Sequence, residues 1–400
     1  MEIEVMGQVT SGFELVREEY ARLWDGIEVG SSFCVYHQGE KVVDLWGGYT
    51  DREMTREWQA DTLVNVYSTT KGPAALAIAV LHDEGKIDYD EKVVTYWPEF
   101  GAEGKQQVTV AQLLSHQAGL CGVDTRLSIN DLYDWNKMVN LLAAQKPLWP
   151  LGTGAGYHAV TWGYFPGELI RRITGKTLGQ YFRDKVAIPL SADFYIGLPE
   201  TEFSRCATLI GPNYARTDHT STNDAGMSDS SKNSPPPKPD MPRLYPIALL
   251  NPSISPFRDA CSKAWRLAEI AASNGHASAR GIASIYGNLA MAGASRDAPS
   301  GITSVISQEA LSEALKVEVD GPEDLVLGGK LRRARGFMLN SGGAYGPNPN
   351  AFGHAGAGGS IGFADTEAGI GFGYAMNQMH FDSATTPRSK RLLNAVYKCI

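Results

Sequence analysis

The segment Gly72–His82 is small or apolar at nearly every position. A helix that is apolar on all sides is buried, whereas a surface helix is amphipathic. Pro73 falls in the first turn, where the missing N–H of proline costs least. The segment therefore predicts a central buried helix, and it places the residues just before it at the end of a rigid element.

Those preceding residues read Ser68-Thr69-Thr70-Lys71. Side chains three apart share one face of a helix, with about 5–6 Å between their Cβ atoms, and a helix N-terminus carries partial positive charge. A serine hydroxyl needs a neighbouring base or cation to act as a nucleophile. The alternative is a serine cap followed by a solvated lysine, but a lysine beside a buried helix is costly unless it is paired or functional. We therefore predict that Ser68 is a nucleophile activated by Lys71.

Two glycine-rich segments add further candidates. Residues 150–159 form a glycine-rich loop that carries Tyr157, and a helix is predicted to follow it through 168–172. Residues 353–363 read as a glycine-dense strand edge, which leads into an alternating apolar strand at 370–377. Glycine lets the main chain approach a ligand closely, as an oxyanion site requires.

The order of these motifs resembles the serine β-lactamase and penicillin-binding-protein superfamily. Ser-x-x-Lys comes first, then Tyr157, then a His-x-Gly triplet at 354–356, and residues 110–120 are similar to the family's LLxHxAGL segment. Within the superfamily the chain most resembles class C β-lactamases and family VIII carboxylesterases, from about residue 33 to residue 376. The resemblance implies a β-lactamase-like α+β sandwich.

Two motifs depart from the class C pattern. Tyr-x-Asn is replaced by Tyr157-His158-Ala159, which has no amide to hold a β-lactam side chain. Lys-Thr-Gly is replaced by His-Ala-Gly at 354–356, which lacks the cation that grips a β-lactam carboxylate. Both departures look more like the esterases of this superfamily, and they imply weak β-lactam hydrolysis at most.

The mechanism that the resemblance implies is acyl transfer without a metal or other cofactor. Ser68 would attack an ester carbonyl, and Tyr157 would be the general base, its pKa of about 10 lowered by Lys71. The main-chain N–H groups of Ser68 and Ala357 would form the oxyanion hole. His354 would contact substrate or hold the Tyr157–Lys71 network, with a structural role as the alternative. The other substrate-binding candidates are Gly356, Trp149 and Tyr133, and simple packing is an equal alternative for the two aromatic residues.

Two other patterns suggest different enzymes. Gly358–Gly362 matches the Gly-x-Ser-x-Gly nucleophile elbow, with Ser360 as its serine, but that motif needs a helix after the turn. Residues 363–369 read instead as a turn between strands, so we do not expect Ser360 to be the nucleophile. Residues 173–177 are similar to the end of a P-loop, but no glycine stands five residues before Gly175, and we expect a helix C-terminus there.

Composition restricts the possible partners. The 400-residue chain is 43 % hydrophobic and carries a formal net charge of −8, which argues against nucleic acid or an anionic membrane as a partner. The first seven residues lack the apolar core of a secretory signal, and no run of about 18 apolar residues is present. The five cysteines (Cys34, Cys121, Cys206, Cys261 and Cys399) are scattered and odd in number, which predicts free thiols and a cytoplasmic location. Three histidines (His82, His116 and His276) lack metal-ligand spacing, and we expect core or surface roles for them.

The distribution of strand signals suggests how the chain is organised. An amphipathic helix is predicted at 12–24 and a hairpin at 32–37 and 41–46, and strands resume only after Leu327. We therefore expect one antiparallel sheet from both ends of the chain, flanked by helices. This sheet domain would comprise 1–66 and 327–400, and a mostly helical domain, 67–326, would be inserted between them. Residues 218–242 are rich in Ser, Asn, Asp and Pro, and are predicted to be a mobile surface loop.

The function that we predict is hydrolysis of small carboxylic esters with short acyl groups, by an enzyme whose oligomeric state stays open. An acyltransferase that passes the acyl group to an alcohol would use the same motifs. A β-lactamase or D-amino-acid peptidase is a further alternative. A catalytically silent ligand sensor is another class, and the intact Ser68, Lys71 and Tyr157 argue against it.

Overall fold

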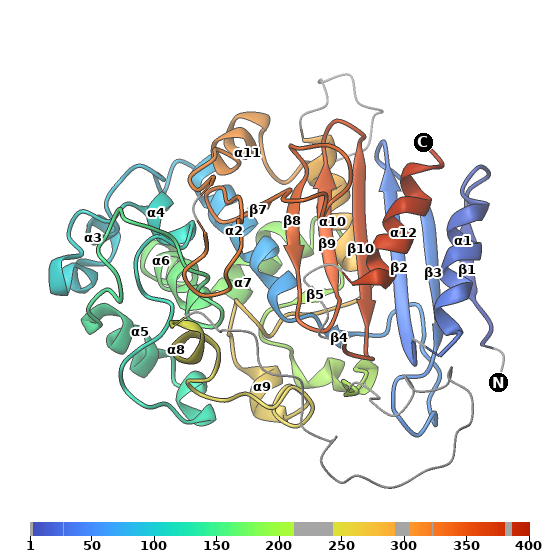
Figure 1. The fold of residues 1–400 in the computed structure, drawn as a ribbon, viewed down its shortest axis with the longest axis horizontal. Helices are drawn as coiled ribbons and strands as arrows, with labels where there is room; N and C mark the ends of the chain where they lie inside the picture. The colour runs from blue at the N-terminus through green and yellow to red at the C-terminus, as the bar shows by residue number, and fades with distance from the viewer. Residues whose placement is uncertain (1–2, 27, 212–242, 293–303, 322, 381–385) are drawn as a thin grey trace, which may run out of the picture.

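The computed structural model describes residues 3–26, 28–211, 243–292, 304–321, 323–380 and 386–400 (Figure 1). The loop predicted at 218–242 lies outside the described residues. Short 3-10 and π-helical turns connect many of the regular elements.

The main sheet has seven strands in the order β1-β3-β2-β10-β9-β8-β7, and every pairing is antiparallel. The strands are β1 (Met6–Val9), β2 (Gly30–His37), β3 (Glu40–Gly48), β7 (Met338–Leu339), β8 (Phe352–Ala355), β9 (Ile361–Asp365) and β10 (Ile370–Met376). Strand β10, near the C-terminus, pairs with β2 near the N-terminus. The predicted sheet built from both ends of the chain is therefore confirmed.

The two faces of this sheet carry different residues. Glycines at 371 and 373 alternate with Phe372 along β10, and a Cβ atom on Gly371 would lie 2.0 Å from the main-chain nitrogen of Gly287 in α10 (Ala279–Met291). On the other face, Phe372 packs against Phe33 with ring centroids 4.8 Å apart. Figure 1 shows α1 (Glu14–Ala21) and α12 (Pro387–Tyr397) on that second face. The sheet is thus the middle layer of a sandwich.

The remaining helices lie mostly in the middle of the sequence, on one side of the sheet in Figure 1. They are α2 (Lys71–Asp83), α3 (Val93–Tyr96), α4 (Val110–Leu114), α5 (Trp135–Ala144), α6 (Tyr164–Thr174), α7 (Leu178–Phe182), α8 (Tyr245–Leu249), α9 (Lys263–Leu267) and α11 (Gln308–Ala314). Helix α6 ends at Thr174, and Gly175 follows in the left-handed conformation. The predicted helix C-terminus at 173–177 is therefore confirmed, and the P-loop alternative fails.

Helix α2 is the central helix that the apolar run predicted. Its residues from Lys71 to Leu81 are all buried. Gly72 permits a close contact, because a Cβ atom there would lie 1.9 Å from the hydroxyl of Tyr286 on α10. The start of α2, just after Ser68, is therefore fixed against the helix that covers the sheet.

The structure also contains strands that we did not predict. A small sheet has the order β4-β6-β5 and is built from β4 (Val64–Asn65), β6 (His276–Ala277) and β5 (Phe194–Tyr195). The expectation that strands resume only after Leu327 was therefore wrong, because strands of two residues leave no periodic pattern. In the described part of the chain, no helix combines the length and the apolar character that crossing a bilayer requires.

Candidate active site

Ser68 opens a tight helical turn that leads directly into α2. Residues Ser68–Thr70 form a 3-10 turn and α2 begins at Lys71. Residues three apart nearly eclipse each other in 3-10 geometry, so Lys71 is brought over Ser68. The preceding residue, Tyr67, has φ 44° and ψ −129°, a conformation that non-glycine residues rarely adopt. Such strain costs about 1–3 kcal/mol and persists only where the surroundings enforce it.

Lys71 is fully buried, and its Nζ atom contacts three oxygen atoms. It lies 3.2 Å from Oγ of Ser68, 2.8 Å from the carbonyl oxygen of Ala159 and 2.9 Å from that of Ala272. No carboxylate is paired with it among the described residues. Burial lowers the pKa of Lys71 well below its ordinary value. The site therefore favours the neutral amine, which is a base.

Tyr157 is held in place by the main chain and side chain of His116. The carbonyl oxygen of His116 accepts the N–H of Gly156 at 3.1 Å, and Nδ1 of its ring accepts the N–H of His158 at 3.0 Å. The rings of His116 and Tyr157 pack with centroids 5.2 Å apart. We expected only a core or surface role for His116, and the structure shows that it fixes the two residues that flank Tyr157.

The phenol of Tyr157 faces both Lys71 and His354. Nζ of Lys71 lies 4.7 Å from the centroid of the Tyr157 ring, and the hydroxyl is 3.5 Å from Nε2 of His354. Burial raises the pKa of Tyr157 above its ordinary value, although a hydrogen bond to Ser68 opposes that rise. Our expectation that Lys71 acidifies this phenol is therefore wrong for the free enzyme. The reason is that desolvation disfavours the phenolate more than the nearby groups stabilise it.

His354 lies at the end of strand β8 and is 5 % exposed. Its Nδ1 is 2.7 Å from the carbonyl oxygen of Ala355, and a carbonyl oxygen only accepts, so Nδ1 carries the proton. Burial lowers the pKa of His354 to about 3, which keeps the ring neutral. Nε2 is then an acceptor, and it faces the hydroxyl of Tyr157. This contact is compatible with one of the two roles that we predicted for His354, holding the Tyr157–Lys71 network, and that role stays a prediction.

The turn after β8 lies against the Ser68 segment. A Cβ atom on Gly356 would lie 2.1 Å from the carbonyl oxygen of Val66, so only glycine fits there. Ser360 donates its hydroxyl to the same carbonyl at 2.8 Å and lies 3.1 Å from Oγ1 of Thr69. Ser360 is 1 % exposed and precedes a strand, so it lacks both the access and the geometry of a nucleophile elbow.

The two predicted oxyanion donors remain accessible at this junction. Ser68 is half-buried and Ala357 is exposed. Within the described part of the chain, neither main-chain N–H has an assigned acceptor. Both groups are therefore available to a substrate oxygen.

Trp149 and Tyr133 occupy different surroundings. Trp149 is buried in a small apolar cluster with Tyr157, and its Nε1 donates to the carbonyl oxygen of Gly154 at 3.2 Å. It therefore supports the tyrosine loop by packing. Tyr133 lines a cavity of about 200 Å³ with Trp135 and Glu269, and Ser68, Lys71 and Tyr157 are not among the residues that line it.

A buried ion pair behind Tyr157 was not predicted from the sequence. Asp324 accepts the main-chain N–H of Tyr157 at 3.3 Å and pairs with Arg333, and both side chains are 1 % exposed. No local pattern marks them, because they meet Tyr157 only in three dimensions. In the described ranges, no group of three or more His, Cys, Asp or Glu residues is arranged to hold a metal ion.

Comparison with known proteins agrees with this geometry. The β-lactamase family model matches residues 17–396. The esterase/β-lactamase LipL of Mycobacterium tuberculosis is 34 % identical over 386 residues, which cover 94 % of this chain and 83 % of the relative. A solved family VIII carboxylesterase is 45 % identical with a TM-score of 0.88, covering 99 % of this chain and all of that one. EstA from Arthrobacter nitroguajacolicus is 33 % identical with a TM-score of 0.80, and the match covers 98 % of this chain and 97 % of EstA.

The chain belongs to the β-lactamase family. It is a serine hydrolase of the esterase and β-lactamase type, and its fold is that of the family VIII carboxylesterases. The resemblance inferred from the three motifs is thus confirmed. The roles of the individual residues remain proposals.

Proposed function

We propose that this protein hydrolyses small carboxylic esters with short acyl groups through an acyl-enzyme on Ser68. The observation that carries this proposal is the contact between Nζ of Lys71 and Oγ of Ser68, at 3.2 Å. A buried amine whose pKa is lowered is the kind of base that a serine hydroxyl needs. The departures from the class C motifs and the names of the esterase relatives support an ester substrate.

The three contacts of Lys71 fit a neutral amine. A neutral amine has two N–H bonds and one lone pair. The two N–H bonds are directed to the carbonyl oxygens of Ala159 and Ala272, which can only accept. The lone pair is then left for the hydroxyl proton of Ser68. We assign Lys71 as the group that takes this proton while Oγ attacks the ester carbonyl.

Tyr157 then serves as a proton carrier next to the leaving group. Its raised pKa keeps the hydroxyl protonated, so it can donate to the departing alkoxide and then recover from Lys71 the proton that Lys71 took from Ser68. The oxyanion of the tetrahedral intermediate accepts from the N–H groups of Ser68 and Ala357. A water molecule, deprotonated by the same groups, then cleaves the acyl-enzyme to the carboxylic acid and frees Ser68.

The decisive experiment is a burst assay with a short p-nitrophenyl ester. The wild-type protein should release about one equivalent of p-nitrophenol rapidly before steady turnover, as acyl-enzyme kinetics require. Ser68→Ala should abolish the burst, and a serine-reactive phosphonate should label the peptide that contains Ser68. Absence of a burst and of labelling at Ser68 would refute the proposal. Assays with added alcohols test the acyltransferase alternative, because they measure how much of the acyl-enzyme transfers its acyl group to the alcohol instead of water. Hydrolysis of a chromogenic cephalosporin tests the β-lactamase alternative.

We also propose that the protein works in a reducing, cytoplasmic compartment. All five cysteines are free, and Cys34, Cys121 and Cys206 are buried. Free buried thiols are typical of proteins in reducing surroundings. Detection of the protein in an oxidising compartment would contradict this proposal.

A further inference from the structure

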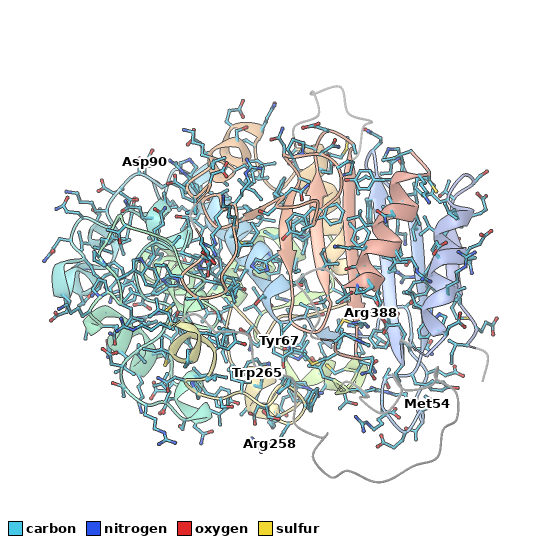
Figure 2. The ribbon with its side chains drawn as sticks, viewed as in Figure 1. Met54, Tyr67, Asp90, Arg258, Trp265 and Arg388 are labelled. Atoms are coloured by element: carbon cyan, nitrogen blue, oxygen red, sulfur yellow. The ribbon has the colours of Figure 1, made fainter. Side chains whose placement is uncertain are left out.

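An arginine from the C-terminal helix reaches the turn that follows β8. Arg388 lies near the start of α12 (Figure 2). It is buried, with 2 % of its surface exposed. Nη2 of its guanidinium donates to the carbonyl oxygen of Gly358 at 2.7 Å, and Nη1 donates to that of Gln378 at 3.0 Å. Nη1 also donates to the carboxylate of Glu28. A single buried side chain therefore links three segments that are distant in the sequence.

The turn that Arg388 contacts carries the proposed oxyanion donor Ala357. Gly358 is the next residue, and its carbonyl oxygen also accepts the main-chain N–H of His380 at 3.0 Å. Gly359 has φ 123°, and a Cβ atom there would lie 2.6 Å from Nη2 of Arg388. Glycine at this position therefore leaves the room that the guanidinium occupies.

The opposite side of the turn is fixed by the nucleophile segment. Ser360 donates to the carbonyl oxygen of Val66, and the N–H of Gly356 donates to the carbonyl oxygen of Ser360 at 2.7 Å. Ala357 therefore lies between two attachments, one to the Ser68 segment and one to Arg388. Its own N–H is left without an assigned acceptor among the described residues.

We propose that Arg388 is a positioning residue of the oxyanion hole. It holds the carbonyl group of Gly358, and this sets the direction of the neighbouring Ala357 N–H toward the substrate oxygen at Ser68. Arg388 does not touch substrate, and its effect passes through the turn. The inference rests on the proposed function, because it takes Ala357 as an oxyanion donor.

The chemistry of arginine suits this role. A guanidinium presents several N–H donors in a fixed planar fork, whereas a lysine ammonium is a compact charge on a flexible stem. Burying an ion pair is weak evidence for stability, since well-packed apolar residues often serve as well. Glu28 balances the charge of Arg388 and also accepts the hydroxyl of Tyr374. The fork of Arg388 therefore donates to carbonyl groups in addition to its ion pair with Glu28.

The test compares Arg388→Lys with Arg391→Lys on the same helix. Arg391 has a side chain that is 42 % exposed and pairs with Glu19 at the surface. With p-nitrophenyl acetate, we expect Arg388→Lys to lower kcat about 10- to 100-fold, less than the about 10²–10³-fold loss on removing an oxyanion donor. KM should change by about twofold or less, because the defect appears only in the transition state. Affinity for a boronic acid, which forms a tetrahedral adduct on serine, should fall by the same factor as kcat/KM.

The control Arg391→Lys should match the wild type in kcat, in KM and in affinity for the boronic acid. A second variant, Gly359→Ala, places a methyl group against the guanidinium and should reproduce the kcat loss while leaving the charge of Arg388 intact. Unfolding curves and near-ultraviolet circular dichroism establish that each protein is folded at the assay temperature. The proposal is overturned if folded Arg388→Lys keeps wild-type kcat, or if kcat falls while the affinity for the boronic acid is unchanged.

Failure of the positioning role differs from failure of the proposed function. If wild-type protein shows neither an ester burst nor phosphonate labelling at Ser68, the function itself fails. If wild-type protein shows the burst and Arg388→Lys behaves like Arg391→Lys, the function stands and the role of Arg388 is refuted.

Discussion

Nζ of Lys71 lies 3.2 Å from Oγ of Ser68, and both atoms belong to one continuous helical segment. The proposed nucleophile and its proposed base therefore need no tertiary contact to meet. What tertiary structure adds is burial, because α2 is enclosed by the helices and the sheet. Burial removes water from the amine and lowers its pKa.

The first prediction concerns the pH dependence of acylation. In the proposed mechanism the neutral form of Lys71 is the active one, and the pKa of Lys71 is lowered. We therefore expect kcat/KM for a short p-nitrophenyl ester to rise as the pH increases through that pKa, and to be low at pH values beneath it. Lys71→Arg should lower kcat/KM about 10²–10⁴-fold, since a guanidinium does not deprotonate in this range. A pH-rate profile of both proteins checks this. If the residual activity of Lys71→Arg is lost on the acidic side at the same pH as that of the wild type, another group is the base.

The second prediction separates the hydroxyl of Tyr157 from its ring. Tyr157→Phe keeps the ring that packs against His116 and faces Lys71. We expect kcat to fall about 10²–10⁴-fold through loss of proton transfer, with the free energy of unfolding changed by about 1 kcal/mol or less. Stopped-flow acylation and urea unfolding measure the two effects. Full acylation by Tyr157→Phe would exclude Tyr157 as a proton carrier.

The fold could be predicted from the sequence where the signals were local. The hairpin of β2 and β3 and the apolar α2 follow from residues that are adjacent in the chain. The Ser68–Lys71 contact follows from spacing alone. Strand β1 gave no such signal, because three of its four residues are exposed and it contains Gly7.

Features that depend on tertiary contacts could not be predicted from these patterns. The strained φ of Tyr67 is enforced by neighbours such as Asn274, which forms an isolated bridge with it. The raised pKa of Tyr157 comes from burial, which a motif does not specify. The contact of Arg388 with Gly358 joins residues 30 positions apart and has no sequence pattern.

The third prediction compares the two candidate serines. Ser360→Ala should keep the amplitude of the burst, because its hydroxyl is buried and already donates to the carbonyl oxygen of Val66, although loss of this attachment of the Ala357 turn should slow the burst. The carbonyl oxygen of Val66 keeps the N–H of Thr69 as a donor at 3.2 Å, so loss of the Ser360 hydrogen bond should cost about 0.5–1.5 kcal/mol of stability. Ser68→Ala should show the reverse, with the burst lost and stability nearly kept. Burst amplitude and urea unfolding of both variants decide the matter, and loss of the burst in folded Ser360→Ala would restore the elbow hypothesis.

The last prediction concerns stability in acid. Burial lowers the pKa of His276 to about 3, and its ring is 2 % exposed in strand β6. The unfolded chain takes up a proton at this histidine near pH 6.5 while the folded chain does not, so stability falls as pH drops from about 6.5 toward 3. Each such histidine changes the free energy of unfolding by about 1.4 kcal/mol per pH unit in that range. The pKa values of His158 and His354 are lowered in the same way.

The free energy of unfolding of His276→Gln should therefore fall less steeply with decreasing pH than that of the wild type, by about the slope that one histidine contributes. Urea unfolding at pH 7, 6 and 5 measures it, with the difference at pH 7 giving the packing cost of the substitution. Parallel curves for the two proteins would show that His276 is protonated in the folded state or does not titrate on unfolding.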